Sequence, residues 1–226
     1  MHGTLSDEVF EKLKVLRSGC DLYFDCGDCI KTGNLGIPLG TDPVWAKLDA
    51  LSVDSSVLGN RETHPLAKVQ RDKLRGVAHH VVVANMWNLD GESFTNRSLT
   101  FQDVNGLKIG VLGVMVPMAT EQKRDKALWS TRWTQPIPEA VKMAESMRAE
   151  CDLLIALTHI GFKRDIELAQ SAPQIDIIFG GHSHTVLTKP HREGRTYICQ
   201  GGSHNRFAGV YEWSDGELTG ELHSLR

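Results

Sequence analysis

Residues 157–185 carry the sequence LTHIGFKRDIELAQSAPQIDIIFGGHSHT, which decides the fold. This stretch continues an apolar run, LLIAL (153–157), passes through a helical pattern at 165–171 and reaches a second apolar run, IDIIF (175–179). Short apolar strands separated by a helix are typical of an α/β domain. Histidines follow both runs: His159, His182 and His184. Because ligands of open α/β sheets bind beyond the carboxyl ends of the strands, these histidines mark a candidate site.

Short strands that run into polar residues also occur earlier in the chain. Strands are predicted over 21–25, 55–59 and 80–84, and they are followed by Gly27-Asp28, Gly59-Asn60 and Asn85. Helices are predicted over 7–18, from Pro43, from Pro65 to before Gly76, and over 137–151. A hairpin of strands 99–104 and 107–116 is predicted about Asn105-Gly106, and closing strands are predicted over 196–199, 208–213 and 217–223. Several strands that each deliver a nitrogen or oxygen ligand to one edge can assemble a metal site.

The composition limits the class of protein. The chain has 226 residues, the length of one sizeable domain, and 41% of them are hydrophobic, which excludes intrinsic disorder. There are 25 basic and 28 acidic residues, so the basic footprint of a duplex nucleic-acid binder is missing. The longest apolar run, 109–119, is shorter than the ~20 residues needed to span a bilayer, so no membrane role is expected.

The N-terminus and the cysteines indicate a compartment. The opening MHGTLSDEVF lacks the basic and apolar regions of a signal peptide, and five cysteines are an odd number for a disulfide scaffold. A cytoplasmic protein is therefore expected, or a secreted or periplasmic one if a signal peptide precedes Met1. Cys26 and Cys29 also form a C-x-x-C pattern, the signature of thiol–disulfide enzymes. A loop, rather than a helix, follows this pair, which disfavours redox chemistry.

The order G-D…G-N…H…G-H-x-H resembles the calcineurin-like metallophosphoesterases. Residues 157–185 and the closing stretch ICQGGSHNRFAGVYEW (198–213) are similar to the 5′-nucleotidase branch of that family. The resemblance implies a four-layer α/β/β/α sandwich with two mixed sheets. It also implies that residues 1–226 form a single catalytic domain, without the C-terminal domain that grips the nucleoside in that branch. Two divalent transition-metal ions (Mn, Fe, Zn, Co or Ni) are implied between the sheet edges.

The resemblance also assigns the metal ligands. Asp28 matches the carboxylate that bridges the two ions, whose sharing offsets their repulsion. The ligands implied for the second ion are Asn60, His159 and His182, and those for the first are His2 and His184. The family opens with Asp-x-His, and the position of its aspartate falls immediately before Met1. The chain as given is therefore expected to hold the second ion better than the first. His204, near Gly201-Gly202, is expected to be an edge histidine that borders the pocket.

The loop at 59–64, GNRETH, departs from the family pattern Gly-Asn-His-Glu-Phe-Asp. Arg61 stands at the position of the catalytic histidine and His64 at that of the aspartate that orients it. Arginine is not a proton donor, but it can bind phosphate oxygens and stabilise charge. One hypothesis is that Arg61, with Asn60, binds the phosphate while His64 acts as general acid. The alternative is that the catalytic pair is lost and Arg61 pairs with Glu62 or Asp28.

Two functions follow from these residues. The first is hydrolysis of a small phosphate ester, with a nucleotide as one candidate, by a metal-bound hydroxide. The second is a degenerate family member that binds metal or a phosphate ligand without turnover. The sequence leaves open whether the substrate is a monoester or a diester, which metal is native and how the chain oligomerises.

Overall fold

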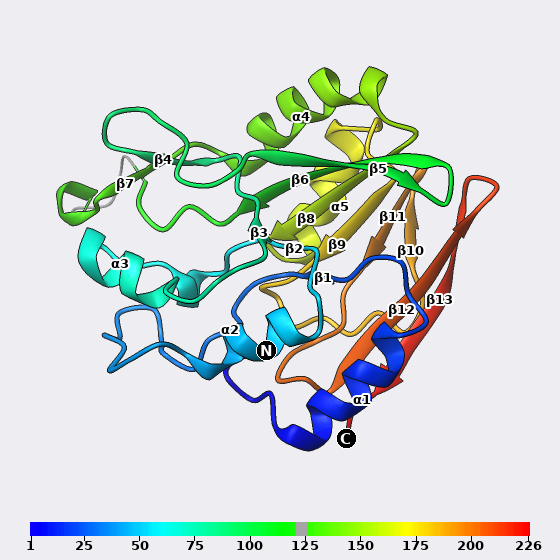
Figure 1. The fold of residues 1–226 in the computed structure, drawn as a ribbon. Coiled ribbons are helices and arrows are strands. Elements are labelled where there is room, and N and C mark those ends of the chain that lie inside the picture. Colours follow the sequence, from blue (N-terminus) through cyan, green and yellow to red (C-terminus); the bar gives the residue numbers. More distant parts are fainter. Residues whose placement is uncertain (121–125) are drawn as a thin grey trace.

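The structure, a computed structural model, describes residues 1–120 and 126–226 (Figure 1). The helices are α1 (Asp7–Arg17), α2 (Pro43–Ala50), α3 (Ala67–Lys73), α4 (Pro136–Met147) and α5 (Phe162–Ser171), with short 3₁₀ turns η1 (Asn60–Glu62), η2 (Lys126–Leu128) and η3 (Arg148–Glu150). The strands are β1 (Phe24–Asp25), β2 (Ser55–Ser56), β3 (His80–Val81), β4 (Met86–Asn88), β5 (Ser98–Val104), β6 (Leu107–Met115), β7 (Thr131–Trp133), β8 (Leu153–His159), β9 (Ile177–Gly180), β10 (His191–Glu193), β11 (Thr196–Cys199), β12 (Phe207–Ser214) and β13 (Glu217–Ser224).

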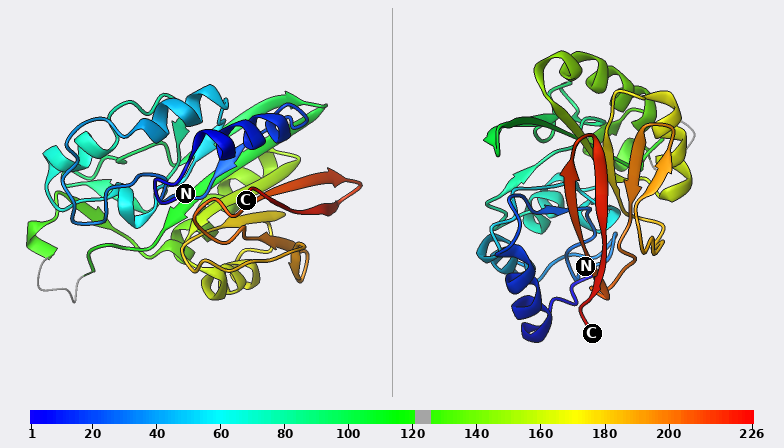
Figure 2. Two further views of the ribbon diagram at one scale, coloured as in Figure 1. Left: turned by 90° about the horizontal axis from the view of Figure 1, so that it is seen from below. Right: turned by 90° about the vertical axis from the view of Figure 1, so that its right-hand side faces the viewer.

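A six-stranded mixed sheet forms the centre of the molecule, in the order β10-β11-β9-β8-β6-β5. Strands β11, β9, β8 and β6 are parallel, and the two edge strands are antiparallel to their neighbours. Every residue of β8 is buried, as its unbroken apolar run predicts. Helices α4 and α5 cover one face, where Ala140, Ala144 and Leu168 pack against the sheet. Figure 2 shows these helices and α1 on opposite sides of the molecule.

The opposite face of the central sheet packs against a second β layer. This layer contains the parallel strands β1-β2-β3 and the antiparallel hairpin β12-β13. Tyr211 and Trp213 of the hairpin contact Phe179 and Tyr197 of the central sheet. Helices α1 and α2 cover the outer side around the buried Trp45. The α/β/β/α order expected from the sequence is therefore present.

The second layer is divided into two separately paired parts. Among the residues described, β1 pairs only with β2 and β12 only with β13. The facing edges of β1 and β12 line one cavity of about 860 Å³. Strands β1, β2 and β3 are also shorter than predicted. After β3, successive backbone N–H groups donate to three different segments. Val82 donates to the carbonyl of Ser56, Val83 to that of Asn96 and Ala84 to that of Gly113.

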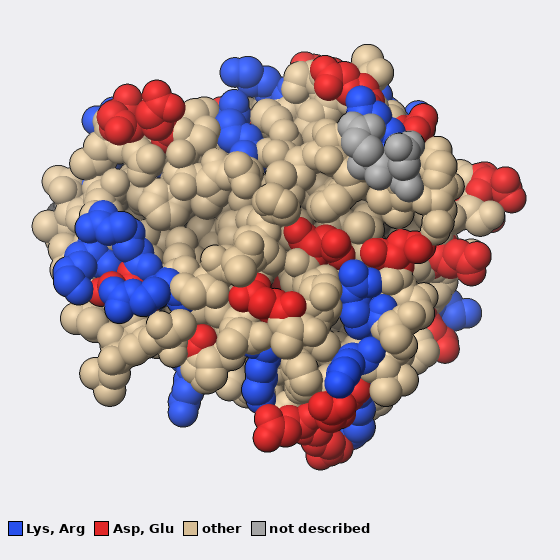
Figure 3. Space-filling model, in the orientation of Figure 1, with Lys and Arg blue, Asp and Glu red and all other residues tan. Residues whose placement is uncertain are grey.

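No helix within the described residues is both long and apolar enough to cross a bilayer. On the face shown in Figure 3, acidic and basic side chains are interspersed. This mixture agrees with the near balance of charge in the sequence.

Candidate metal centre

The predicted ligands meet where the strands of both β layers end. Asp28 follows β1, Asn60 follows β2, His159 ends β8, and His182 and His184 follow β9. The segment before α1 adds His2, whose backbone N–H donates to the Asp28 carbonyl at 2.6 Å. Residues separated by up to 182 positions in the sequence therefore share one site.

Four of these residues form a close group of donor atoms. Nε2 of His159 lies 3.1 Å from Oδ1 of Asn60 and 3.6 Å from Oδ2 of Asp28. Nδ1 of His182 lies 3.2 Å from the same Asn60 oxygen. Donor atoms that share a tetrahedral ion, with bonds of about 2.1 Å, lie roughly 3.4 Å apart. The spacing of this group therefore suits a common cation.

Hydrogen bonds from outside the group orient its lone pairs inward. Nδ1 of His159 lies 2.6 Å from the carbonyl oxygen of Cys26, which can only accept, so the neutral ring carries its lone pair on Nε2. Nδ2 of Asn60 donates to Asn34, which turns the amide oxygen toward His159. Lone pairs of a nitrogen and two oxygens then face one another, an arrangement that a bound cation relieves. The donor set fits a divalent transition metal.

His2 lies on the other side of Asp28. Its Nε2 is 3.9 Å from Oδ2 of Asp28, and its ring centre is 4.9 Å from that of His184. Oδ2 of Asp28 is thus within 4 Å of a ring nitrogen of His159 on one side and of His2 on the other, as a bridging carboxylate requires. Burial lowers the pKa of His2 to about 4 and also lowers the pKa of His182, so both rings are neutral at pH 7 and able to bind a metal. Among the described residues, no three His, Cys, Asp or Glu side chains are close enough to hold a metal ion by themselves. The group of Asp28, His159 and His182 therefore needs the amide oxygen of Asn60 as a further ligand.

Backbone strain is concentrated at these residues. Nine described residues other than glycine have a positive φ, and four of them are predicted ligands: His2 (57°), Asp28 (58°), His182 (76°) and His184 (57°). A left-handed conformation costs an L-residue about 1–2 kcal/mol. Such strain gathers at functional sites, where the surrounding structure holds it in place.

Glu62 joins the two loops that carry Asp28 and Asn60. Its buried carboxylate accepts hydrogen bonds from the backbone N–H groups of Asp28, Cys29, Ile30 and Gly59 at 2.7–3.1 Å. Burial is the main cause that raises the pKa of Glu62, and the four N–H groups stabilise its ionised form. The carboxylate therefore holds one loop against the other.

Lys73 supports the same loops from α3. Its ammonium group is buried and lies 2.7–2.9 Å from four carbonyl oxygens, those of Gly33, Asn34, Arg61 and Thr63. Sequence reasoning missed both Glu62 and Lys73. For Lys73 a signal was present, because it stands four residues after Val69 and so shares the buried face of the helix.

Arg61 and His64 occupy different surroundings. The backbone N–H of Arg61 donates to Oδ1 of Asp28, and its guanidinium donates to the carbonyls of Ile30 and Lys31. His64 is 5% exposed, and its Nδ1 accepts a hydrogen bond from the N–H of Leu66. His64 also contacts Gln70 and Lys73 of α3 and the backbone of Leu35 in the loop before α2. Its role as general acid remains a prediction.

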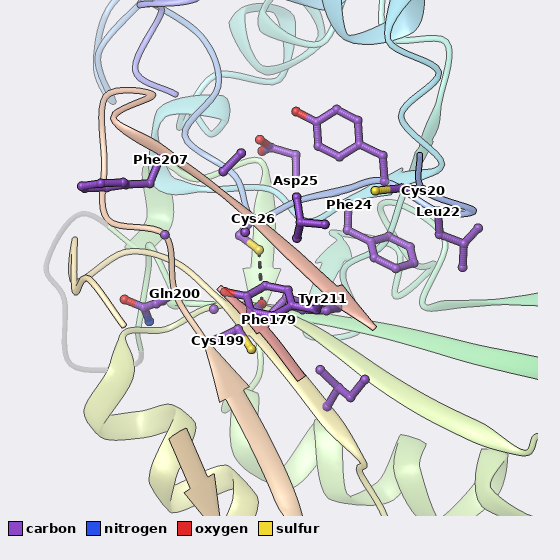
Figure 4. Close-up of a pocket in the computed structure, with 18 of the residues that line it drawn as sticks. Cys20, Leu22, Phe24, Asp25, Cys26, Phe179, Cys199, Gln200, Phe207 and Tyr211 are labelled. Atoms are coloured by element: carbon purple, nitrogen blue, oxygen red, sulfur yellow. Dashed lines mark hydrogen bonds between the residues drawn. The ribbon is translucent and has the colours of Figure 1, made fainter. Parts of the chain in front are cut away.

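The cavity between β1 and β12 is lined by residues of both β layers, among them Phe24, Phe179 and Tyr211 (Figure 4). His2, Asp28, His159, His182 and His184 are among the lining residues, and others come from α1, β1, the central sheet and the β12-β13 hairpin. In Figure 4, Cys26 and Phe179 are joined by a hydrogen bond of 3.3 Å from the thiol to the carbonyl. Burial raises the pKa of Cys26 and Cys29 well above the usual thiol range, so the C-x-x-C pair lacks the thiolate that redox chemistry needs.

A second hydrogen-bonded set has the connectivity of a hydrolase triad. Oγ of Ser56 lies 3.0 Å from Nε2 of His79, and Nδ1 of His79 lies 3.0 Å from Asp49. Ser56 is 1% exposed, and none of the three residues lines the cavity at the histidines. A substrate therefore has no access to the serine, and the set joins α2, β2 and the segment before β3.

Comparisons with known proteins identify relatives of this chain. No protein-family model matches the chain. Protein 5NUC of Lutzomyia longipalpis is 30% identical over 186 residues, covering 76% of this chain and 31% of its own length. The 5′-nucleotidase of Vibrio cholerae is 24% identical over 260 residues, covering 98% of this chain and 46% of its own. The chain therefore spans less than half the length of these curated relatives.

A solved structure supports the fold assignment. The calcineurin-like phosphoesterase YfkN from Bacillus subtilis superposes with a TM-score of 0.74 at 21% identity, covering 96% of this chain and 81% of that one.

Proposed function

Because this chain belongs to the 5′-nucleotidase-like metallophosphoesterases, we propose that it hydrolyses a phosphate ester at a centre of two divalent transition-metal ions. The observation that carries the proposal is the convergence of Asp28, Asn60, His159 and His182, with lone-pair atoms 3.1–3.6 Å apart. Such ions, when bound, lower the pKa of a coordinated water and polarise phosphoryl oxygens.

The chain's own residues then have separate tasks. Asn60, His159 and His182 would hold one ion, His2 and His184 would hold the other, and Asp28 would serve both. Glu62 and Lys73 fix the loops that carry Asp28 and Asn60, so the ligands are placed before the substrate arrives.

Arg61 is proposed to bind the phosphate. Its backbone is tied to Asp28, and one guanidinium nitrogen is used by the carbonyls of Ile30 and Lys31. The remaining N–H groups can bind two phosphoryl oxygens and stabilise the charge that develops on them. The substrate is proposed to be a small phosphate ester, and the named relatives make a nucleotide the first candidate.

The test begins with metal content. The protein is loaded with Mn²⁺, freed of excess ion and analysed by elemental mass spectrometry, and then assayed with nucleoside monophosphates, p-nitrophenyl phosphate and bis-p-nitrophenyl phosphate. We expect bound Mn²⁺ and hydrolysis, both largely lost in Asp28→Asn and retained in Asp215→Asn, an exposed turn residue. Metal uptake without hydrolysis of any ester would favour the degenerate binding protein instead. If both metal positions were equally occupied at low Mn²⁺, the expected weaker binding at the position of His2 and His184 would be wrong.

The acid role of His64 has its own test. A proton donor matters for an alkyl leaving group and hardly at all for nitrophenolate. His64→Ala should therefore reduce hydrolysis of an alkyl phosphate more than hydrolysis of p-nitrophenyl phosphate. An equal reduction for both substrates would remove His64 from the mechanism.

A further inference from the structure

The space between β1 and β12, which we call the seam, is bounded by two strand edges that have no strand partner among the described residues. Residues 22–26 and 207–213 line it, and in the described part of the chain no backbone hydrogen bond joins one segment to the other. Alternate backbone N–H and C=O groups of each segment therefore point into the seam. Unpaired groups at a strand edge are a template for pairing with a further strand.

The width of the seam suits one strand. The rings of Phe24 in β1 and Tyr211 in β12 both pack against the ring of Phe179 in the central sheet, with centres 6.1 and 5.8 Å from it (Figure 4). The rings of the two edge strands are thus no more than two such separations apart. A strand that pairs with both edges needs two interstrand spacings of about 4.7–4.9 Å each. The separation of the edges therefore fits a single inserted strand.

Apolar side chains cover the seam from both sides. The central sheet and α1 contribute, among others, Ile155, Ile177, Leu13 and Leu16. The edge at β1 already alternates between these two layers, because Phe24 packs in the core against the central sheet and Tyr23 in the core beneath α1. An inserted strand would place its side chains alternately in the same two cores. Both sets of positions favour apolar residues, as in the buried strand β8.

We propose that the seam binds an extended apolar peptide strand of a partner chain, which pairs with β1 and β12 and joins them into one sheet. The flanking segments set the length of this strand at about six residues, or roughly 20 Å. A lipid of similar size would fill the cavity of about 860 Å³ but leave the backbone groups of both edges unpaired, which costs free energy. Addition of a strand to an open sheet edge is a general mode of peptide recognition. The inference is independent of the proposed metal centre.

The test titrates the chain with a synthetic peptide of six valine, isoleucine and leucine residues, made soluble by a tail of lysines. Trp213 reports binding, because it lines the seam and the other four tryptophans do not. We expect its emission to shift to the blue and to saturate at one peptide per chain. Trp213→Phe should lose this signal while calorimetry still detects binding. Isotope-edited infrared spectra of a peptide with ¹³C carbonyls should show the amide I band of a β-strand in the complex.

Controls separate strand pairing from simple apolar binding. The same peptide with proline at its third residue should bind at least about tenfold more weakly, because proline lacks the N–H and is not tolerated in a strand paired on both sides. Leu16→Glu places a charge over the seam and should weaken binding of the original peptide by at least about tenfold. Val15→Glu, at a side chain of α1 that is 73% exposed, should bind as the parent chain does. Both variants should keep the circular dichroism of the parent chain, and if Leu16→Glu does not fold, the comparison of the two peptides still decides.

Three results would overturn the proposal. The folded chain could show no saturable binding of the original peptide. It could bind the proline peptide equally well, which would make the seam a site for apolar ligands in general. It could also form dimers that Leu16→Glu dissociates, which would make a second copy of this chain the occupant. None of these results changes the expected metal content or hydrolysis, so a failure here is distinguishable from a failure of the proposed function.

Discussion

Asp165 should make the stability of this protein depend on pH in an unusual direction. Its carboxyl group is fully buried in α5, where it accepts hydrogen bonds from Oγ1 of Thr158 at 2.6 Å and Nε2 of Gln200 at 2.9 Å. Gln200 in turn accepts from Ser183 and from the backbone N–H of Thr185, so the network underlies the loop of His182 and His184. Burial raises the pKa of Asp165 to about 7, and the two hydrogen bonds only partly oppose this effect.

The sign of the effect follows from the two protonation states. Below pH 3.8 the group is protonated in both the folded and the unfolded chain, and its contribution to stability is fully present. Between pH 3.8 and about 7 only the unfolded chain releases the proton, so the free energy of unfolding falls as pH rises. A shift of this size corresponds to about 4 kcal/mol in total, and to roughly 2–3 kcal/mol between pH 5 and pH 8.

The perturbation is Asp165→Asn, which keeps the shape and remains neutral at every pH. The amide can accept from Gln200 and donate to the hydroxyl of Thr158, so the network survives. Urea unfolding at pH 5, 6, 7 and 8 gives the difference in free energy between variant and parent. This difference should change by roughly 2–3 kcal/mol in favour of the variant from pH 5 to pH 8. Asp215→Asn, at the exposed turn, should show no such trend. A pH-independent difference for Asp165→Asn would refute the reasoning.

Two further predictions concern the supports of the site. Lys73→Met removes the donor to the carbonyls of Gly33, Asn34, Arg61 and Thr63 and should lower the free energy of unfolding by roughly 3–5 kcal/mol in urea titrations. Lys68→Met, on the exposed side of the same helix, should change it by less than about 0.5 kcal/mol. A small loss for Lys73→Met would mean that water replaces the ammonium group. Gly181→Ala would place a methyl 2.6 Å from the Cys26 carbonyl and 3.0 Å from Nδ1 of His159. It should weaken Mn²⁺ binding about 10–100-fold, whereas Gly40→Ala, in open space, should bind as the parent does, and calorimetric titration distinguishes the two.

Local sequence patterns predicted most of the fold. Helix α1 begins after the predicted cap Ser6, whose hydroxyl accepts from the N–H of Val9, and the hairpin of β5 and β6 turns at Asn105-Gly106 as expected. Strands β4, β7 and β10 were missed because each has three residues, too few for a periodic pattern. Their existence depends on partners elsewhere in the chain, such as the pairing of β4 with β7.

The candidate site, like the fold, could be predicted from the sequence only in part. Asp28, Asn60, His159, His182 and His184 were candidates because they follow apolar runs, the family resemblance named them as ligands together with His2, and the structure brings them together. The hydrogen bonds of Glu62 and Lys73 were not predictable, since they join segments about 30–40 residues apart, and only the burial of Lys73 had a periodic signal. His204 was expected only to border the pocket. Its nearness to His2 depends on how the β12-β13 hairpin docks, which a local pattern does not contain.

The open edges of β1 and β12 have a consequence for hydrogen exchange. Strand β8 is paired on both sides, so its amides should exchange only when the central sheet unfolds. The amides on the side of β12 that faces away from β13 border the cavity and have no ladder partner among the described residues. They should exchange through local fluctuations, many orders of magnitude faster, although they belong to one of the two packed β layers. A map of protection factors would thus mark a fast-exchanging line within the second layer of an otherwise slowly exchanging sandwich.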